Sequence, residues 1–234
     1  MLVEVIACSL ADAVVAREAG ADRVELCLAM EVGGITPYLV TTEQMGALAP
    51  FPVSVMVRPQ PGGFNYGTDT VLSQIEQILD LRFPNLQIVS GVLNNQNEFD
   101  LAGMRAIRRA TKGVPLTCHR CFDLTPYPMV ALEQLIDLGF DRVLTSGQAP
   151  TAQLGLDVIA NLVDQADGRI EIMPAVGIRP YNVAEIIKAT GVKQVHASCF
   201  GDNPPPVPGK VDFGPTLRVS ADKVRAFVSA ARSA

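Results

Sequence analysis

Hydrophobic and polar positions repeat along the chain in one unit: an amphipathic stretch at helical spacing, then a glycine, then a short aliphatic run. The unit is clearest at 17–27, 136–146 and 187–198. Glycine suits the left-handed position that closes a helix, and the β-branched run that follows is typical of a strand. The pattern therefore predicts helices and strands in alternation.

Eight aliphatic runs predict strands at 2–8, 22–27, 53–58, 86–92, 115–120, 141–146, 170–174 and 194–199. Helical patterns lie near 9–20, 37–49, 68–82, 98–112, 126–139, 151–166, 180–190 and 219–232. Eight alternating units without a break in composition fit one domain, 1–234, folded as an α/β (β/α)8 TIM barrel. An open doubly wound sheet is the alternative. Several prolines predict an irregular loop at 201–218, before the last helix.

Period-two alternation within the strands predicts which side chains face the barrel interior. Helices cover the outer face of such a barrel, so the aliphatic positions must point outward. Val24 and Leu26 on the outer face turn Glu25 and Cys27 inward. The same rule turns further residues inward: Glu4, Ser54, Met56, Arg58, Glu171, Met173, His196 and Ser198.

The stretch CHRCF at 118–122 carries two thiols, an imidazole and a guanidinium. Alternation predicts Cys118 and Arg120 behind the strand, and His119 and Cys121 on its inner face. The two cysteines then face opposite ways. A thioredoxin-type pair needs a turn that opens a helix, so neither a redox pair nor a chelating pair is predicted here.

Composition narrows the functional class. The net charge is −5, and no basic run could track phosphates, which argues against nucleic-acid binding. No apolar segment is long enough to cross a membrane. Five cysteines and no basic leader after Met1 predict reduced thiols in the cytoplasm. A homodimer is compatible with the sequence, but no interface can be predicted.

The inward polar residues suggest an enzyme that acts on a small anionic metabolite. Arg58 could clamp a carboxylate or phosphate, and His119 could act as general acid or base with Asp123 or Glu25 orienting it. His196 is a second interior imidazole. The alternative is a charge network that only fills the barrel core.

Hydrogen-bond donors to an anion are expected near the ends of strands six to eight, where barrels often bind phosphate. Gly147 and Gly177 could supply backbone N–H groups, and Arg179 and Ser198 could add side-chain donors. Helix-start chemistry alone explains Arg179 equally well.

Cysteines suggest a second kind of ligand. Cys8 and Cys27 come at the ends of the first two strands, so their thiols could meet at the barrel mouth. Cu(I) prefers soft thiolates and can be held by two of them. Buried free cysteine is also an ordinary small hydrophobic residue, so both interpretations stay open.

Several motifs together resemble the CutC family of copper-homeostasis proteins: GGITP at 33–37, VMVRP at 55–59, HRCFD at 119–123 and VHAS at 195–198, among others. The resemblance covers about residues 1–200. It implies a (β/α)8 barrel in the cytoplasm and a role in copper homeostasis, with Cu(I) bound through cysteine.

The chain departs from the family pattern at three places. Family members usually read HRAFD, so Cys121 is an addition. The loop PQPGGFNYG at 59–67 lacks the family's cysteine. PAVGIR at 174–179 has lost two glycines, and we expect Ala175 and Val176 to resist positive φ and to weaken a phosphate cradle there.

Overall fold

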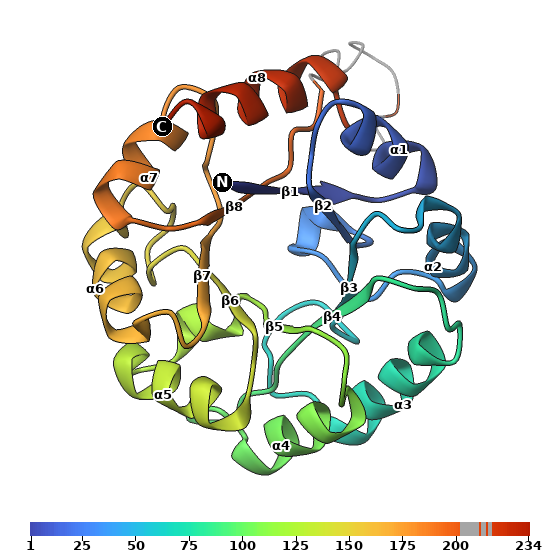
Figure 1. Cartoon of the computed structure of the whole chain (residues 1–234). Helices are drawn as coiled ribbons and strands as arrows, with labels where there is room; N and C mark the ends of the chain where they lie inside the picture. Colours follow the sequence, from blue (N-terminus) through green and yellow to red (C-terminus); the bar gives the residue numbers. More distant parts are fainter. Residues whose placement is uncertain (202–210, 212–213, 215–216) are drawn as a thin grey trace.

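Parallel strands form the centre of the protein, and the α-helices surround them as an outer ring (Figure 1). The computed structural model describes residues 1–201, 211, 214 and 217–234. Its strands are β1 (Leu2–Ala7), β2 (Arg23–Leu26), β3 (Val53–Val57), β4 (Leu86–Ser90), β5 (Leu116–Cys118), β6 (Arg142–Thr145), β7 (Glu171–Pro174) and β8 (Gln194–Ala197). Each lies within a run predicted from the sequence.

Helices alternate with these strands in the order that the pattern predicts. They are α1 (Leu10–Glu18), α2 (Leu39–Gln44), α3 (Thr68–Leu79), α4 (Leu101–Ala110), α5 (Pro128–Leu138), α6 (Leu156–Ala166), α7 (Val183–Thr190) and α8 (Ala221–Arg232). Short 3₁₀ helices are η1 (Met30–Val32), η2 (Met45–Leu48) and η3 (Arg120–Leu124). The prediction of a (β/α)8 TIM barrel is confirmed. Most of the predicted loop at 201–218 lies outside the described residues.

The barrel is nearly closed. Its hydrogen-bonded strand order is β7-β6-β5-β4-β3-β2-β1-β8, all parallel in the registers described. The seam between β7 and β8 carries no strand ladder within the part of the chain that the structure describes. Packing between β7 and β8 and between the outer helices α7 and α8 spans this seam in place of a ladder.

Alternation along the strands separates two cores. The outward residues, such as Val3, Val24 and Val55, belong to the large apolar layer between barrel and helices. Inside the barrel, a small cluster of Ile6, Cys27, Met56 and Val89 lies on one side and a cluster of Leu144, Met173 and Ala175 on the other. The inward assignment of Cys27, Met56 and Met173 is confirmed.

Glycines close helices where the repeat predicts them. Gly139 and Gly191 follow α5 and α7 with φ of +77° and +70°. Gly20, two residues after the last residue of α1, has φ of +101°. An L-side chain is disfavoured in this region of φ, so these glycines explain why each helix stops there. None of the helices among the described residues is long and apolar enough to span a bilayer.

Two glycines that begin helices provide a matched test of packing beside β6. Gly155 precedes α6, and an alanine Cβ there would lie 2.1 Å from the carbonyl oxygen of Ser146. Gly67 precedes α3, and nothing lies within 4 Å of the corresponding position. We expect Gly155→Ala to lower the free energy of unfolding by about 1–3 kcal/mol through overpacking. Gly67→Ala should change it by less than about 0.5 kcal/mol. Urea denaturation measures both, and equal effects would contradict the packing argument.

Candidate functional site

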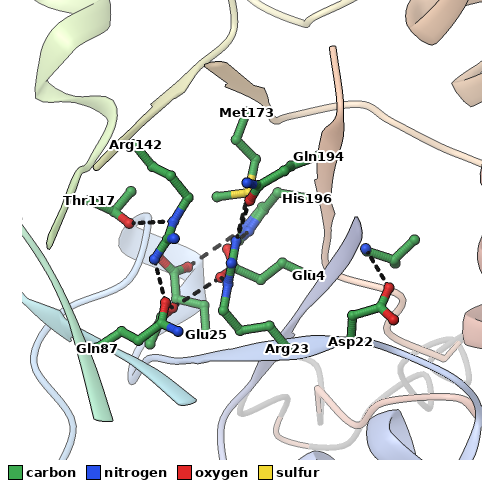
Figure 2. Close-up of polar contacts among 12 residues, drawn as sticks. Glu4, Asp22, Arg23, Glu25, Gln87, Thr117, Arg142, Met173, Gln194 and His196 are labelled. Carbon is green, nitrogen blue, oxygen red and sulfur yellow. Dashed lines mark hydrogen bonds and ion pairs between the residues drawn. The ribbon is translucent and has the colours of Figure 1, made fainter. Parts of the chain in front are cut away.

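A buried polar network fills the barrel below its mouth, with the Glu4 carboxylate at its centre (Figure 2). Arg23 donates from Nε to Glu4, and the Ser54 hydroxyl donates to the same carboxylate at 3.1 Å. His196 Nδ1 lies 2.7 Å from Glu4 Oε1. Burial alone would raise the pKa of Glu4, but Arg23 and His196 outweigh it and hold that pKa far below its usual range.

Glu25 and His196 connect this network to the cavity above. His196 Nε2 lies 3.7 Å from Glu25 Oε2, and the Cys27 thiol donates to the same oxygen at 3.2 Å. Burial raises the pKa of Glu25. Burial also lowers the pKa of His196, but the Glu25 and Glu4 carboxylates outweigh it and the net shift is upward. Glu25 Oε1 is buried without a hydrogen-bond partner among the described residues.

A cavity of about 410 Å³ opens at the carboxyl ends of the strands. Its polar lining comprises Glu25, Cys27, Arg58, His119, Arg120, Gly177, Arg179, His196 and Ser198. Eight of the predicted site residues therefore meet in one cavity. Glu25 is the only carboxylate among these lining residues, against three arginines, in a chain whose net charge is −5.

Arg58 is already held by the protein. Its Nη1 donates to the carbonyl oxygens of Val32 and Gly34 at 3.0 and 2.9 Å, and its Nη2 donates to Gly62. The guanidinium carbon lies 4.7 Å from the ring centre of Phe64. Only Nε is unpaired in the described part of the chain. A bidentate clamp of the predicted kind would require the Nη1 and Nη2 donors of Arg58. These donors already bind the carbonyl oxygens of the loops on either side of β3.

His119 is also fixed. Its Nδ1 accepts the backbone N–H of Cys121 at 3.3 Å, and its Nε2 lies 3.1 Å from the Tyr66 hydroxyl. Tyr66 in turn donates to the carbonyl oxygen of Gly91. We assign the proton to Nε2, because Nδ1 must accept. Neither Asp123 nor Glu25 orients the ring, contrary to expectation. Tyr66 orients the ring instead. It lies in the loop between β3 and α3, where the alternation rule for strands does not apply.

Asp123 does not line the cavity, and its carboxylate accepts hydrogen bonds from the loop after β6. Its carboxylate accepts the backbone N–H groups of Ser146 at 3.1 Å and Gln148 at 3.3 Å, and the hydroxyl of Thr145. The N–H of Gly147 donates to Thr145 Oγ1 at 2.9 Å. Asp123 thus occupies the place where Gly147 was expected to hold an anion, so the predicted donors of this turn are used internally.

The stretch CHRCF differs from its predicted arrangement. β5 ends at Cys118, and His119 caps η3, so alternation no longer applies beyond that point. Cys121 turns back toward Cys118, with 3.7 Å between the sulfurs, and both are fully buried on the helix side. Arg120 instead lines the cavity. The predictions of opposed cysteines and of an outward Arg120 are therefore wrong.

The loop after β7 supplies open donors. Val176 and Gly177 have φ of +75° and +71°, so the expectation that Val176 resists positive φ is wrong. A β-branched residue in this region is strained. The backbone N–H groups of Val176, Gly177 and Ile178 have no acceptor among the described residues. Among the described residues, the Arg179 guanidinium donates from Nη1 alone, toward the carbonyl oxygen of Ile178 at 3.0 Å.

Cys8 and Cys27 directly follow the last residues of β1 and β2. These strands are paired as far as Ala7 and Leu26, and the Cys27 N–H donates to the carbonyl oxygen of Ala7 at 3.0 Å. Cys8 is half-buried and does not line the cavity. Burial, together with nearby carboxylates, raises the pKa of Cys8 to about 11 and that of Cys27 well above its usual value.

Met30 adds a soft donor that the sequence pattern did not indicate. A Cβ placed on Gly34 would lie 3.4 Å from Met30 Sδ and 3.5 Å from Cys27 Sγ, so the two sulfurs converge on one point. Within the described ranges, no group of three or more His, Cys, Asp and Glu side chains is arranged to share a metal ion. A metal here would depend on sulfur donors.

Comparison with known proteins gives a consistent result. The family model described as CutC family matches residues 1–201. A CutC family protein of Glaesserella parasuis is 41% identical over 202 residues, which are 86% of this chain and 83% of the relative. One from Treponema denticola is 41% identical over 197 residues, 83% of this chain and 79% of the relative.

Solved structures agree. A crystal structure of CutC from Streptococcus agalactiae, described provisionally as a copper homeostasis protein, superposes with a TM-score of 0.77 at 32% identity, covering 85% of this chain and 98% of that one. Phosphoribosylanthranilate isomerase from Pyrococcus furiosus superposes with a TM-score of 0.62 at 18% identity over the full length of both chains. The second likeness shows the fold alone.

The raised pKa of His196 predicts a pH dependence of stability. A histidine with a raised folded pKa contributes stability that is complete below its unfolded pKa of about 6.5 and is lost as pH rises through the folded pKa. The charged groups in contact with it are Glu4 and Glu25, with Arg23 beyond Glu4. The free energy of unfolding should therefore fall above about pH 6.5, and His196→Gln should reduce that fall. Urea denaturation across this range gives the slopes, and parallel slopes would contradict the assignment.

Proposed function

Because the chain belongs to the CutC family, we propose that it serves copper homeostasis by binding Cu(I) at the barrel mouth through Cys8 and Cys27. The observation that carries this proposal is that the two cysteines directly follow Ala7 and Leu26, the last paired residues of the neighbouring strands β1 and β2. The Met30 thioether, which converges with the Cys27 thiol above Gly34, is the expected third donor. Thiolates and thioethers are the ligands that select Cu(I).

The local charge explains how such a site would work. Burial, together with Asp12 and Glu31 at Cys8 and Glu25 at Cys27, raises the pKa of both thiols and so favours their protonated form in the metal-free protein. A bound Cu⁺ would displace these protons. Glu25 would then face the metal site through its contact with Cys27.

Anaerobic Cu(I) titration of the reduced protein against a competing chelator tests the site. We expect Cys8→Ser/Cys27→Ser to lose one tightly bound equivalent of Cu(I). Met30→Leu should weaken that equivalent roughly tenfold, since it removes one of three soft donors. Cys199→Ser is the matched control, because Cys199 is another half-buried thiol at a strand end. Equal binding by the double variant and the parent would contradict the proposal.

A second candidate is the binding of a small phosphorylated or carboxylated metabolite in the same cavity. Two of the lining arginines, Arg58 and Arg179, have no carboxylate partner among the described residues, whereas Arg120 pairs with Asp123 at 2.8 Å, and these two arginines favour the candidate. The N–H groups of Val176 and Gly177, which have no acceptor in the described part of the chain, lie in the loop after β7, where barrels often hold phosphate. Arg179 and Ser198 would complete the anion site. If the ligand is a substrate, Glu25 is better suited than His119 to move protons, because burial raises its pKa and its Oε1 has no hydrogen-bond partner among the described residues.

Inorganic phosphate is the probe for this second candidate. At ten times its Kd, phosphate should stabilise the protein by about 1.4 kcal/mol, which raises the Tm by about 3–6 °C. Arg179→Ala should weaken binding roughly tenfold, as expected for one charge-assisted contact. Arg105→Ala removes the same charge from the exposed surface of α4 and should leave binding unchanged. The absence of a shift in the parent protein would contradict this candidate.

A further inference from the structure

Two residues that line the mouth cavity each bury one polar atom without a hydrogen-bond partner in the described part of the chain. The atoms are Oε1 of Glu25, an acceptor, and Nε of Arg58, a donor. Only 2% of Glu25 and 5% of Arg58 is exposed. Buried polar groups are normally paired, because an unpaired one destabilises the fold. The two atoms therefore indicate a ligand that offers a donor to one and an acceptor to the other.

Both side chains are held in place by their remaining polar atoms. Oε2 of Glu25 accepts the Cys27 thiol at 3.2 Å and lies 3.7 Å from His196 Nε2. The two Nη atoms of Arg58 donate to backbone carbonyl oxygens. Glu25 is paired in register with Ser54, whereas Arg58 lies past the end of β3. The acceptor is therefore at the floor of the cavity and the donor at its rim.

The loop after β7 offers a third contact, across the mouth from Arg58. β3 and β7 lie on opposite sides of the barrel (Figure 1). The N–H groups of Val176, Gly177 and Ile178 have no acceptor among the described residues, and Arg179 adds a positive charge. The cavity between the two sides measures about 410 Å³, which is within the range of about 300–1,000 Å³ typical of small-molecule sites. One small ligand can therefore reach all three positions.

We propose that this cavity binds a phosphorylated polyhydroxy compound, with its phosphate at the loop after β7 and its hydroxyls on Glu25 and Arg58. The inference rests on the anion site of the second candidate above and names its ligand class. A hydroxyl donates to Oε1 and accepts from Nε equally well. A carboxylate at the floor would place a second negative charge beside Glu25. An alkyl chain would leave both atoms unpaired.

The same geometry predicts how the cavity discriminates between phosphate esters. A site built to hydrogen-bond a ligand hydroxyl rejects the analogue that lacks it, because the buried groups of the protein are then left without partners. The phosphate contributes equally to the binding of either ester, so the preference must come from the Glu25 and Arg58 end. Selectivity and anion binding are therefore separate properties of the cavity, and each can fail without the other.

Calorimetric titration of the reduced, metal-free protein tests the ligand class independently of copper. The probes are inorganic phosphate, ribitol 5-phosphate and n-pentyl phosphate, which has the same carbon chain without the hydroxyls. We expect ribitol 5-phosphate to bind at least about tenfold more tightly than n-pentyl phosphate, as expected for a hydrogen bond to a charged group. Equal affinities of the two esters would overturn the inference, while binding of inorganic phosphate would leave the anion site standing. If none of the three probes bound, the second candidate and this inference would both fail.

Glu25→Leu tests where the hydroxyls bind, because leucine fills a similar volume without an acceptor. We expect this variant to lose the preference for ribitol 5-phosphate, so that the two esters bind within about threefold of each other. Glu76→Leu removes a carboxylate from the exposed face of α3 and should keep the preference. Circular dichroism checks the fold of each variant. A folded Glu25→Leu variant with its preference intact would overturn the assignment to Glu25, and if the variant does not fold, the comparison of the two esters on the parent decides.

Discussion

The barrel depends on one buried carboxylate. Glu4 on β1 is paired with Arg23 on β2 and with His196 on β8, and it accepts the Ser54 hydroxyl from β3. Breaking a buried ion pair by removing one partner costs about 3–5 kcal/mol, because the remaining charge is left uncompensated. Glu4 therefore specifies how four of the strands meet.

The same network joins the seam that lacks a ladder. Arg23 Nη2 lies 3.3 Å from Met173 Sδ on β7 and 2.9 Å from Gln194 Oε1 on β8. A side chain from β2 thus crosses the interior and contacts both strands of the seam. The loop after β7, whose N–H groups at Val176, Gly177 and Ile178 have no acceptor among the described residues, begins at this same seam.

Much of this arrangement follows from the sequence, because two simple rules apply to most of the chain. The helix–glycine–strand repeat predicts the barrel, and period-two alternation turns Glu25, Cys27 and His196 inward. Both rules describe regular elements. They identify the residues at the cavity floor, whose orientation is set by the strand that carries them.

The rules do not extend past the strand ends, where the chain changes direction. Cys121 lies beyond the last residue of β5, so the turn of η3 sets its position. Asp123 finds its partners in a loop more than twenty residues away, and Tyr66 reaches His119 from the segment before α3. Such contacts depend on which loops meet at the mouth, and periodicity carries no information about that.

The carboxylates explain why the two thiol pairs need not behave alike. Cys27 donates to Glu25, so a thiolate there would face a negative charge 3.2 Å away. Behind β5, burial raises the pKa of Cys118 and the hydrogen bond between the two sulfurs raises it further, whereas the contacts with Cys118 and His119 outweigh burial and lower the pKa of Cys121. At the mouth, a metal would have to overcome the neighbouring acids before it could displace the thiol protons.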